Sequence, residues 1–180
     1  MSHAAKEFES LNIAVLTVSD TRDESNDTSG KFLVDSALEA GHKISEKRIE
    51  KDDIFQIRYQ VSKWIASEDT QVVLITGGTG FTSRDSTPEA VSVLFEKEVE
   101  GFGELFRKIS FDEIGTSTIQ SRAVAGLANG TLIACMPGST GACRTAWSGI
   151  LKEQLNATHK PCNFVMHLKQ ATADLCESRS

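Results

Sequence analysis

Residues 71–90 read QVVLITGGTGFTSRDSTPEA, and this stretch decides the fold. Segment 71–76 is mostly apolar with several β-branched residues, which is typical of a buried strand. A glycine-rich loop follows at once, and Thr87 before Pro88 is a typical helix start. A strand that runs through a loop into a helix is the repeating unit of a parallel α/β sheet.

The same alternation of strand and helix extends along the chain in both directions. Short apolar runs predict further strands, and these lie at 12–20, 131–136 and, partly exposed, 43–50. Helical spacing of apolar residues and capping signals predict helices at 27–42, 52–69, 91–114 (broken near Gly101 and Gly103) and 143–155. Residues 116–130 are ambiguous, and we predict a short helix there.

These elements predict a single α/β domain over residues 10–165, with terminal extensions at 1–9 and 166–180. The chain of 180 residues is long enough to bury one substantial core. Strands that alternate with helices imply a mostly parallel sheet with helices on both faces.

Composition narrows the classes of function. A net charge of −6 argues against a nucleic-acid binder, which needs a basic face. No apolar run has the length of a membrane span, and the first residues lack the apolar core of a signal peptide, so we expect a cytoplasmic protein without a membrane partner. The cysteines and histidines show no metal-ligand spacing, so no structural metal is expected.

Polar loops follow three of the predicted strands, at 17–30, 76–90 and 136–144. The carboxyl ends of parallel strands meet at one edge of a sheet, and ligands bind at that edge. Glycines there let a ligand approach the backbone, and free N–H groups attract an anion such as phosphate. The candidate ligand-binding residues are Ser19, Asp20, Gly77, Gly78, Thr79, Gly80, Ser139, Thr140 and Gly141.

Asp85 follows the glycines, and a carboxylate beside a phosphate is unfavourable unless a cation lies between them. Mg²⁺ binds one or two carboxylates and leaves its other positions to phosphates and water. Asp85 therefore indicates metal-assisted phosphoryl or nucleotidyl transfer. The alternatives are that Asp85 binds its own loop or caps the helix, and that Asp52 and Asp53 only complement a helix dipole.

The segments TVSD (17–20), LITGGTGFTSRDSTPEA (74–90), SRAVAG (121–126) and MPGSTGACRTAW (136–147) together resemble the molybdopterin-binding family of molybdenum-cofactor biosynthesis, in particular its bacterial MoaB group, to which the MogA-type adenylyltransferases are related. The resemblance runs from about residue 13 to 162. It implies a three-layer α/β/α sandwich that assembles as a homo-oligomer, either a trimer or a hexamer.

The resemblance also implies a reaction. Active family members join molybdopterin and ATP, with Mg²⁺, to give adenylyl-molybdopterin and pyrophosphate. Asp85 matches a catalytic aspartate of the family motif, and Asp52 matches a second one, with a register that leaves Asp53 open. We expect both Asp85 and Asp52 to be catalytic and to bind Mg²⁺. The alternative is a carrier or scaffold of the same pathway that binds molybdopterin without turnover.

Overall fold

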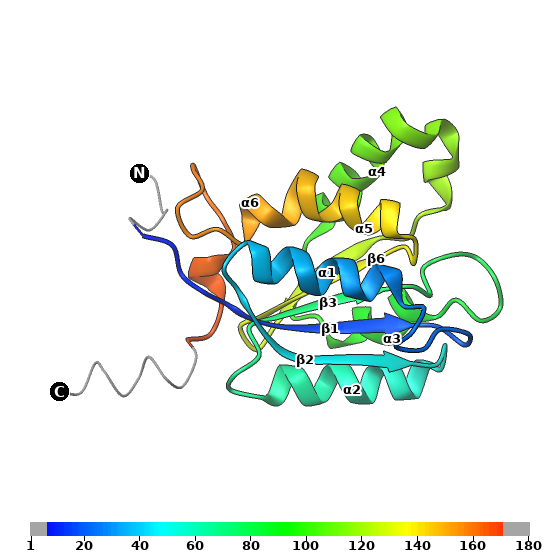
Figure 1. Ribbon diagram of the computed structural model, residues 1–180, viewed down its shortest axis with the longest axis horizontal. Coiled ribbons are helices and arrows are strands. Elements are labelled where there is room, and N and C mark those ends of the chain that lie inside the picture. The colour runs from blue at the N-terminus through cyan, green and yellow to red at the C-terminus, as the bar shows by residue number, and fades with distance from the viewer. Residues whose placement is uncertain (1–6, 171–180) are drawn as a thin grey trace.

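The computed structural model describes residues 7–170, which form a sheet of six strands in the order β2-β1-β3-β6-β5-β4 (Figure 1). The strands are β1 (Asn12–Val18), β2 (Lys43–Glu50), β3 (Val72–Thr76), β4 (Lys97–Glu98), β5 (Val124–Ala128) and β6 (Thr131–Met136). β2, β1, β3 and β6 run parallel, whereas β5 pairs antiparallel with β6 and with β4. The predicted mostly parallel α/β sheet is confirmed.

Helices cover both faces of the sheet. In Figure 1, α1, α4, α5 and α6 lie above it and α2 lies below it, and α3 packs in the same core as α2. The α-helices are α1 (Thr28–Glu39), α2 (Ile54–Ala66), α3 (Thr87–Val91), α4 (Glu100–Ile114), α5 (Thr140–Ala146) and α6 (Lys152–Gln154). Short 3-10 turns occupy Ser92–Leu94, Gly115–Gln120 and Val165–His167, and Trp147–Leu151 forms a π-helical turn between α5 and α6.

Alternating side chains of the central strands supply two separate cores. Ile13 and Leu74 pack into the core beneath α1, α4 and α5, whereas Leu16 and Ile75 pack against α2 and α3. All four are fully buried. A strand that is buried on both faces carries apolar residues without interruption, which is why β3 stands out in the sequence. The structure is therefore the expected three-layer sandwich.

The prediction of a short helix within 116–130 is wrong for most of that segment. A 3-10 turn ends at Gln120, and β5 then runs antiparallel to β6. Asn129 and Gly130 form the connecting turn with φ of 47° and 65°, and a pair of positive φ angles is the requirement of a tight two-residue hairpin. The Asn-Gly pair was the missed signal, because the small residues of β5 give it little hydrophobic contrast.

The helix predicted at 91–114 is also interrupted, but before Glu100 and not near Gly101 and Gly103 as expected. The chain forms a 3-10 turn and β4 before α4 begins at Glu100, so Gly101 and Gly103 lie inside the helix. A Cβ atom on Gly103 would lie 2.5 Å from the carbonyl oxygen of Ala123. Gly103 therefore permits close packing of α4 on the chain that leads into β5.

Both ends of the described chain lie at the amino edge of the sheet, away from the loops predicted to bind a ligand. Phe8 stacks near His42, just before β2, and the backbone N–H of Lys169 donates to Gly130 O, just before β6 (2.8 Å). The domain limits 10–165 stay a prediction, and residues 1–6 and 171–180 of the expected extensions lie outside the described part. Within residues 7–170, no helix is long and apolar enough to cross a membrane.

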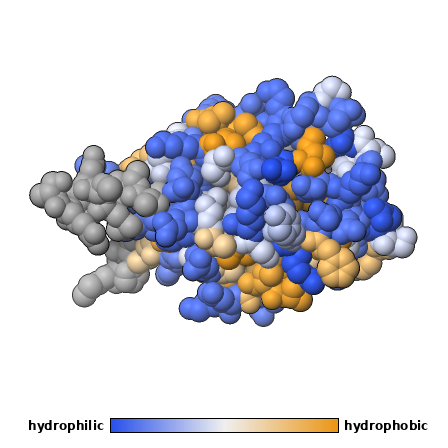
Figure 2. Space-filling model, turned by 90° about the horizontal axis from the view of Figure 1, so that it is seen from below, coloured by the Kyte–Doolittle hydropathy of each residue, from blue (hydrophilic) through white to orange (hydrophobic). Residues whose placement is uncertain are grey.

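The face that carries α2 is largely hydrophilic, with hydrophobic surface gathered in a few patches (Figure 2). Phe55 and Tyr59 on α2 are 70% and 69% exposed, and Val93 beyond α3 is 66% exposed. These side chains contribute to neither core.

His42 makes the free energy of unfolding depend on pH. Burial lowers its pKa, and its Nδ1 accepts the N–H of Leu11 at 3.2 Å, which requires the neutral ring. The unfolded chain therefore binds the proton more readily, and stability should fall as the pH drops below about 6.5, by at most about 1.4 kcal/mol per pH unit.

Denaturant unfolding between pH 5 and pH 8 tests this expectation. His42→Gln should flatten the pH dependence in this range, whereas His167→Gln, at an exposed position, should leave it as in the wild type. An unchanged slope in His42→Gln would contradict the assignment to His42.

Candidate ligand site at the carboxyl edge

A cavity of about 600 Å³ opens where the loops after β1, β3 and β6 meet. The predicted residues that line it are Ser19, Gly77, Gly78, Thr79, Gly80, Asp85 and Ser139. Ile114, Ser117, Gln120 and Ser121, from the end of α4 and the following turn, also line it. The sequence did not indicate this last group, because the segment after α4 was expected to form a short helix within residues 116–130.

Thr140 and Gly141 do not line the cavity and lie in the first turn of α5. The Thr140 hydroxyl lies 3.0 Å from that of Thr28, and Gly141 O accepts a hydrogen bond from Thr145 at 3.0 Å. Ser139 caps α5 by accepting the N–H of Ala142 at 3.1 Å. Within this loop, the structure therefore places only Ser139 of the three predicted residues at the cavity wall.

The glycine turn after β3 brings the loops together. Gly77 and Gly78 have φ of 106° and 63°, a region that glycine adopts without strain. A Cβ atom on Gly77 would lie 2.2 Å from the carbonyl oxygen of Val18. One on Gly78 would lie 2.3 Å from Thr87 Oγ1 and 2.8 Å from Asp52 Oδ1. Asp52, at the end of the loop after β2, therefore lies directly against the glycine turn.

Asp85 lies against the same glycine-rich loop, at Gly80. A Cβ atom on Gly80 would lie 2.9 Å from Asp85 Oδ2, and this oxygen accepts the backbone N–H and the hydroxyl of Thr82 at 2.8 and 2.6 Å. Burial works to raise the pKa of Asp85, but the hydrogen bonds from Thr82 and from the Gly80 backbone outweigh it and hold the pKa below its usual value. Asp85 is thus charged at neutral pH and binds its own loop.

Asp52 and Asp53 have different roles in the structure. The Asp53 carboxylate caps α2 by accepting the N–H groups of Phe55 and Gln56, both at 2.9 Å. The Asp52 carboxylate does not cap the helix, and its pKa is raised by burial and by the negative charges of Asp20 and Asp85. Of the two adjacent aspartates, Asp52 rather than Asp53 therefore faces the glycine turn.

Asp20 lies beside this acidic group rather than in the cavity lining. Its Oδ1 accepts the backbone N–H of Asp52 at 3.2 Å, and Arg84 donates to both of its carboxylate oxygens at 2.9 Å. The hydrogen bond from Arg84 is the main cause of the lowered pKa of Asp20. Within residues 7–170, no group of three or more His, Cys, Asp or Glu side chains is arranged to hold a metal ion on its own.

Two arginines that sequence reasoning did not select hold the loops in place. Arg22 lines the cavity and donates to Gly138 O at 2.7 Å, which joins the first loop to the third. Arg122 donates to Gly80 O at 2.9 Å and to Asp85 O at 3.1 Å. Arg122 stands in the segment SRAVAG that carries part of the family resemblance, whereas Arg22 belongs to no spacing pattern that marks its role.

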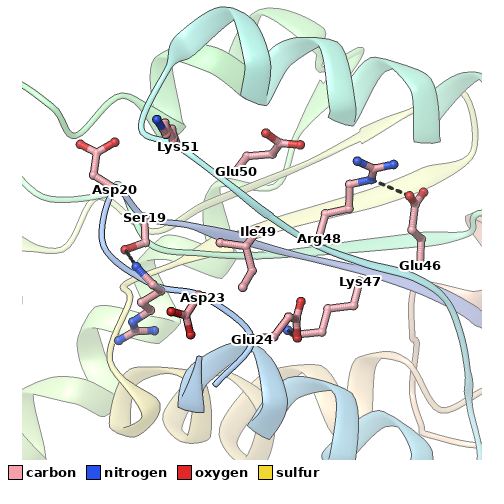
Figure 3. Close-up of a pocket in the computed structure, with 11 residues that line it drawn as sticks. Ser19, Asp20, Asp23, Glu24, Glu46, Lys47, Arg48, Ile49, Glu50 and Lys51 are labelled. Atoms are coloured by element: carbon pink, nitrogen blue, oxygen red, sulfur yellow. Dashed lines mark hydrogen bonds and ion pairs between the residues drawn. The ribbon is translucent and has the colours of Figure 1, made fainter. Parts of the chain in front are cut away.

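A second hollow, of about 570 Å³, lies between the loop after β1 and strand β2 (Figure 3). Two of the cations that line it, Lys47 and Arg48, are already paired. Lys47 contacts Glu24 at 2.6 Å and Asp27 at 3.0 Å, and Arg48 contacts Glu46 at 2.6 Å. In Figure 3 the Asp20 carboxylate points away from these pairs, toward the start of α2. This hollow is therefore less suited to an anion than the cavity at the glycine turn.

The fold and the loops at its carboxyl edge define an α/β domain with a cavity beside a glycine turn that is flanked by carboxylates. Residues 14–157 match the family described as "Probable molybdopterin binding domain". The chain belongs to this family.

Relatives agree with that placement. The chain is 62% identical over 170 residues to Molybdenum cofactor biosynthesis protein B of Escherichia coli K12, covering 94% of this chain and all of the relative. The solved structure "Crystal structure of Molybdenum cofactor biosynthesis protein B" superposes with a TM-score of 0.79 at 45% identity over 82% of this chain and 92% of the other. The tungsten cofactor synthesizing protein MoaB from Pyrococcus furiosus gives a TM-score of 0.73 at 34% identity, over 81% and 92%.

Stability measurements separate the two adjacent aspartates. Asp53→Ala removes the acceptor of two backbone N–H groups and should lower the free energy of unfolding by about 1 kcal/mol. A carboxyl with a raised pKa binds its proton more readily in the fold, so its charge costs stability at neutral pH. Asp52→Asn should therefore raise the free energy of unfolding at pH 7.

Chemical denaturation of both variants at pH 7 gives the two values. Destabilisation by Asp52→Asn, at a level similar to Asp53→Ala, would contradict the distinction between a capping and a site carboxylate.

Proposed function

We propose that this protein is a molybdopterin adenylyltransferase of molybdenum-cofactor biosynthesis, which joins molybdopterin to the adenylyl group of ATP and releases pyrophosphate. The proposal rests on one observation above all. Two carboxylates, Asp52 and Asp85, each lie against a glycine of the same turn, and the turn and Asp85 line a cavity of about 600 Å³. A phosphate bound at that turn would be next to both negative charges.

Mg²⁺ is suited to remove the repulsion between these two carboxylates and a bound phosphate. Burial and neighbouring negative charge raise the pKa of Asp52, so its charge is unfavourable unless a cation is close. The glycine turn lets both carboxylates approach the backbone, because a Cβ atom on Gly78 would meet Asp52 Oδ1 at 2.8 Å and one on Gly80 would meet Asp85 Oδ2 at 2.9 Å. Mg²⁺ needs only one or two carboxylates because substrate phosphates and water supply its other ligands.

The residues of the chain then have defined tasks. Asp52 and Asp85 would hold Mg²⁺, which neutralises the triphosphate when bound. The backbone of Gly77, Gly78 and Gly80 offers the close approach that a phosphate requires. A terminal phosphate oxygen of molybdopterin attacks the α-phosphorus of ATP, the new P–O bond forms, and the bond to the β-phosphate breaks. Catalysis is mainly the positioning of two anions and the neutralisation of their charge.

A carrier that binds molybdopterin without turnover is the second candidate. The hydrogen bonds from Thr82 to Asp85 support it, because they occupy the carboxylate that the enzyme would need. Both candidates place the pterin phosphate at the glycine turn. They differ in whether ATP and Mg²⁺ are consumed together with it.

The measurement that decides between them is pyrophosphate release from molybdopterin and ATP during titration with Mg²⁺. Asp85→Asn should keep the fold and molybdopterin binding, because an amide oxygen can still accept from Thr82, but should lose the Mg²⁺-dependent reaction. Asp35→Asn, the same change in an exposed pair with Lys31 on α1, serves as the control. Activity in Asp85→Asn equal to wild type would remove the metal role.

The expected homo-oligomer, a trimer or a hexamer, also belongs to this proposal, as does the cytoplasmic location. Of the large apolar side chains on α4, Phe102 and Phe106 are buried, whereas Leu105 and Phe111 are 41% and 54% exposed. Ile119, in the turn after α4, is 77% exposed. α4 extends away from the sheet (Figure 1), and large exposed apolar patches are rare on monomers, so we expect a second subunit to cover this surface.

Light scattering coupled to size exclusion tests the assembly. The wild type should elute as a trimer or hexamer, and the double variant Phe111→Lys with Ile119→Lys should shift it toward smaller species. Phe55→Lys, at an exposed position on α2, should leave the mass unchanged. A wild-type monomer of 19.6 kDa at micromolar concentration would contradict the assembly.

A further inference from the structure

Arg84 links the loop after β3 to the loop after β1. Its Nε donates to Asp20 Oδ2 and its Nη2 donates to Asp20 Oδ1, both at 2.9 Å. Asp20 Oδ1 also accepts the N–H of Asp52 at 3.2 Å. One exposed guanidinium therefore covers the carboxylate that accepts the backbone N–H of Asp52.

The pair between Arg84 and Asp20 is easy to break. The Arg84 side chain is 59% exposed and that of Asp20 is 36% exposed. Exposed ion pairs contribute little to stability, because water screens the charges and the long side chain loses freedom. Within residues 7–170, the Arg84 guanidinium makes hydrogen bonds only to Asp20, since Thr82 contacts the backbone N–H of Arg84.

Arg84 is also the right cation for an exchange. A guanidinium keeps its charge at any physiological pH, and its planar donors match a carboxylate and a phosphate equally well. Three negative side chains, Asp20, Asp52 and Asp53, act on Arg84 electrostatically. A divalent cation that approaches the same carboxylates is therefore repelled by the positive charge of Arg84.

We propose that Arg84 is an exchangeable counter-ion of the site. In the free protein it pairs with Asp20, and when a divalent cation arrives together with a nucleoside triphosphate, the cation takes over the neutralisation of the acidic group and Arg84 turns to the phosphates. The inference rests on the proposed function, because it concerns the same metal and nucleotide. It adds a consequence, which is that the cation alone binds poorly and binds well only with the triphosphate.

A fixed clamp that only joins two loops makes the opposite prediction. Loss of a clamp loosens the site, so metal and nucleotide would both bind more weakly, or neither would change. Loss of an exchangeable counter-ion removes a positive charge that repels the metal and a donor that binds the phosphates. The two affinities should then move in opposite directions.

Mn²⁺, observed by electron paramagnetic resonance, is a direct probe because it needs no turnover. Arg84→Gln should bind Mn²⁺ alone about fivefold more tightly than the wild type, the scale of one nearby charge in a water-like medium. Calorimetry with ATP in the presence of Mg²⁺ should show several-fold weaker binding. Arg48→Gln, which breaks the comparable exposed pair with Glu46 on β2, should change neither affinity.

Asp20→Asn gives a second route to the same question. It releases Arg84 without removing it, so inorganic tripolyphosphate without metal should bind more tightly than to the wild type. Arg84→Gln and Asp20→Asn should melt close to the wild type, which excludes unfolding as the cause of either effect.

Affinities for Mn²⁺ and for ATP that fall together in Arg84→Gln would overturn the exchange, and so would the absence of Mn²⁺ binding in both wild type and variant. Failure of the proposed reaction has a different signature. In that case pyrophosphate is not released by the wild type, while the opposite shifts in Mn²⁺ and ATP affinity still decide the role of Arg84.

Discussion

The contact of Gly77 with the carbonyl oxygen of Val18 is the constraint on which the site depends. A Cβ atom at Gly77 would lie 2.2 Å from that oxygen, so the loops after β1 and β3 approach each other only because this residue is glycine. Gly78 continues the turn and brings the backbone against Asp52 and Thr87. The carboxylates, the cavity and the first turn of α3 are all placed relative to this junction. This junction lies at the end of β1, which has β2 as its neighbour on one side of the sheet and β3 on the other. α/β sheets commonly bind ligands at such a point, where successive strands are added on opposite sides.

The sequence is sufficient for the centre of the fold and for the main site loops, but less so for the side of the sheet that contains β5 and β4. β3 and β6 are buried on both faces and read as unbroken apolar runs, and the loops after them contain the glycines. β5 is built from small residues, and its direction is set by the Asn129–Gly130 turn, which a search for apolar runs does not detect. The contacts of Arg22 and Arg122 depend on backbone carbonyls that are distant in sequence, and no local pattern predicts such partners.

Four aspartates lie around one glycine turn, and the protein limits their repulsion in different ways. Asp53 is satisfied by the amino end of α2, and Asp85 by Thr82 in its own loop. Asp20 is paired with Arg84, whereas the charge of Asp52 is opposed by burial and by its neighbours. An acidic group that is only partly neutralised is a usual feature of functional sites, where stability is given up for chemistry.

Both ends of the described chain lie at the amino edge of the sheet. Phe8 contacts His42 there, and Lys169 donates a hydrogen bond to Gly130. The ligand loops lie at the other end of the parallel strands. A surface attachment, an affinity tag or a fused domain joined directly at residue 7 or residue 170 would therefore start from the end remote from the glycine turn. For immobilisation on a sensor chip, this geometry favours attachment at these two positions over random coupling through lysines, because Lys47 and Lys51 lie close to the loop after β1.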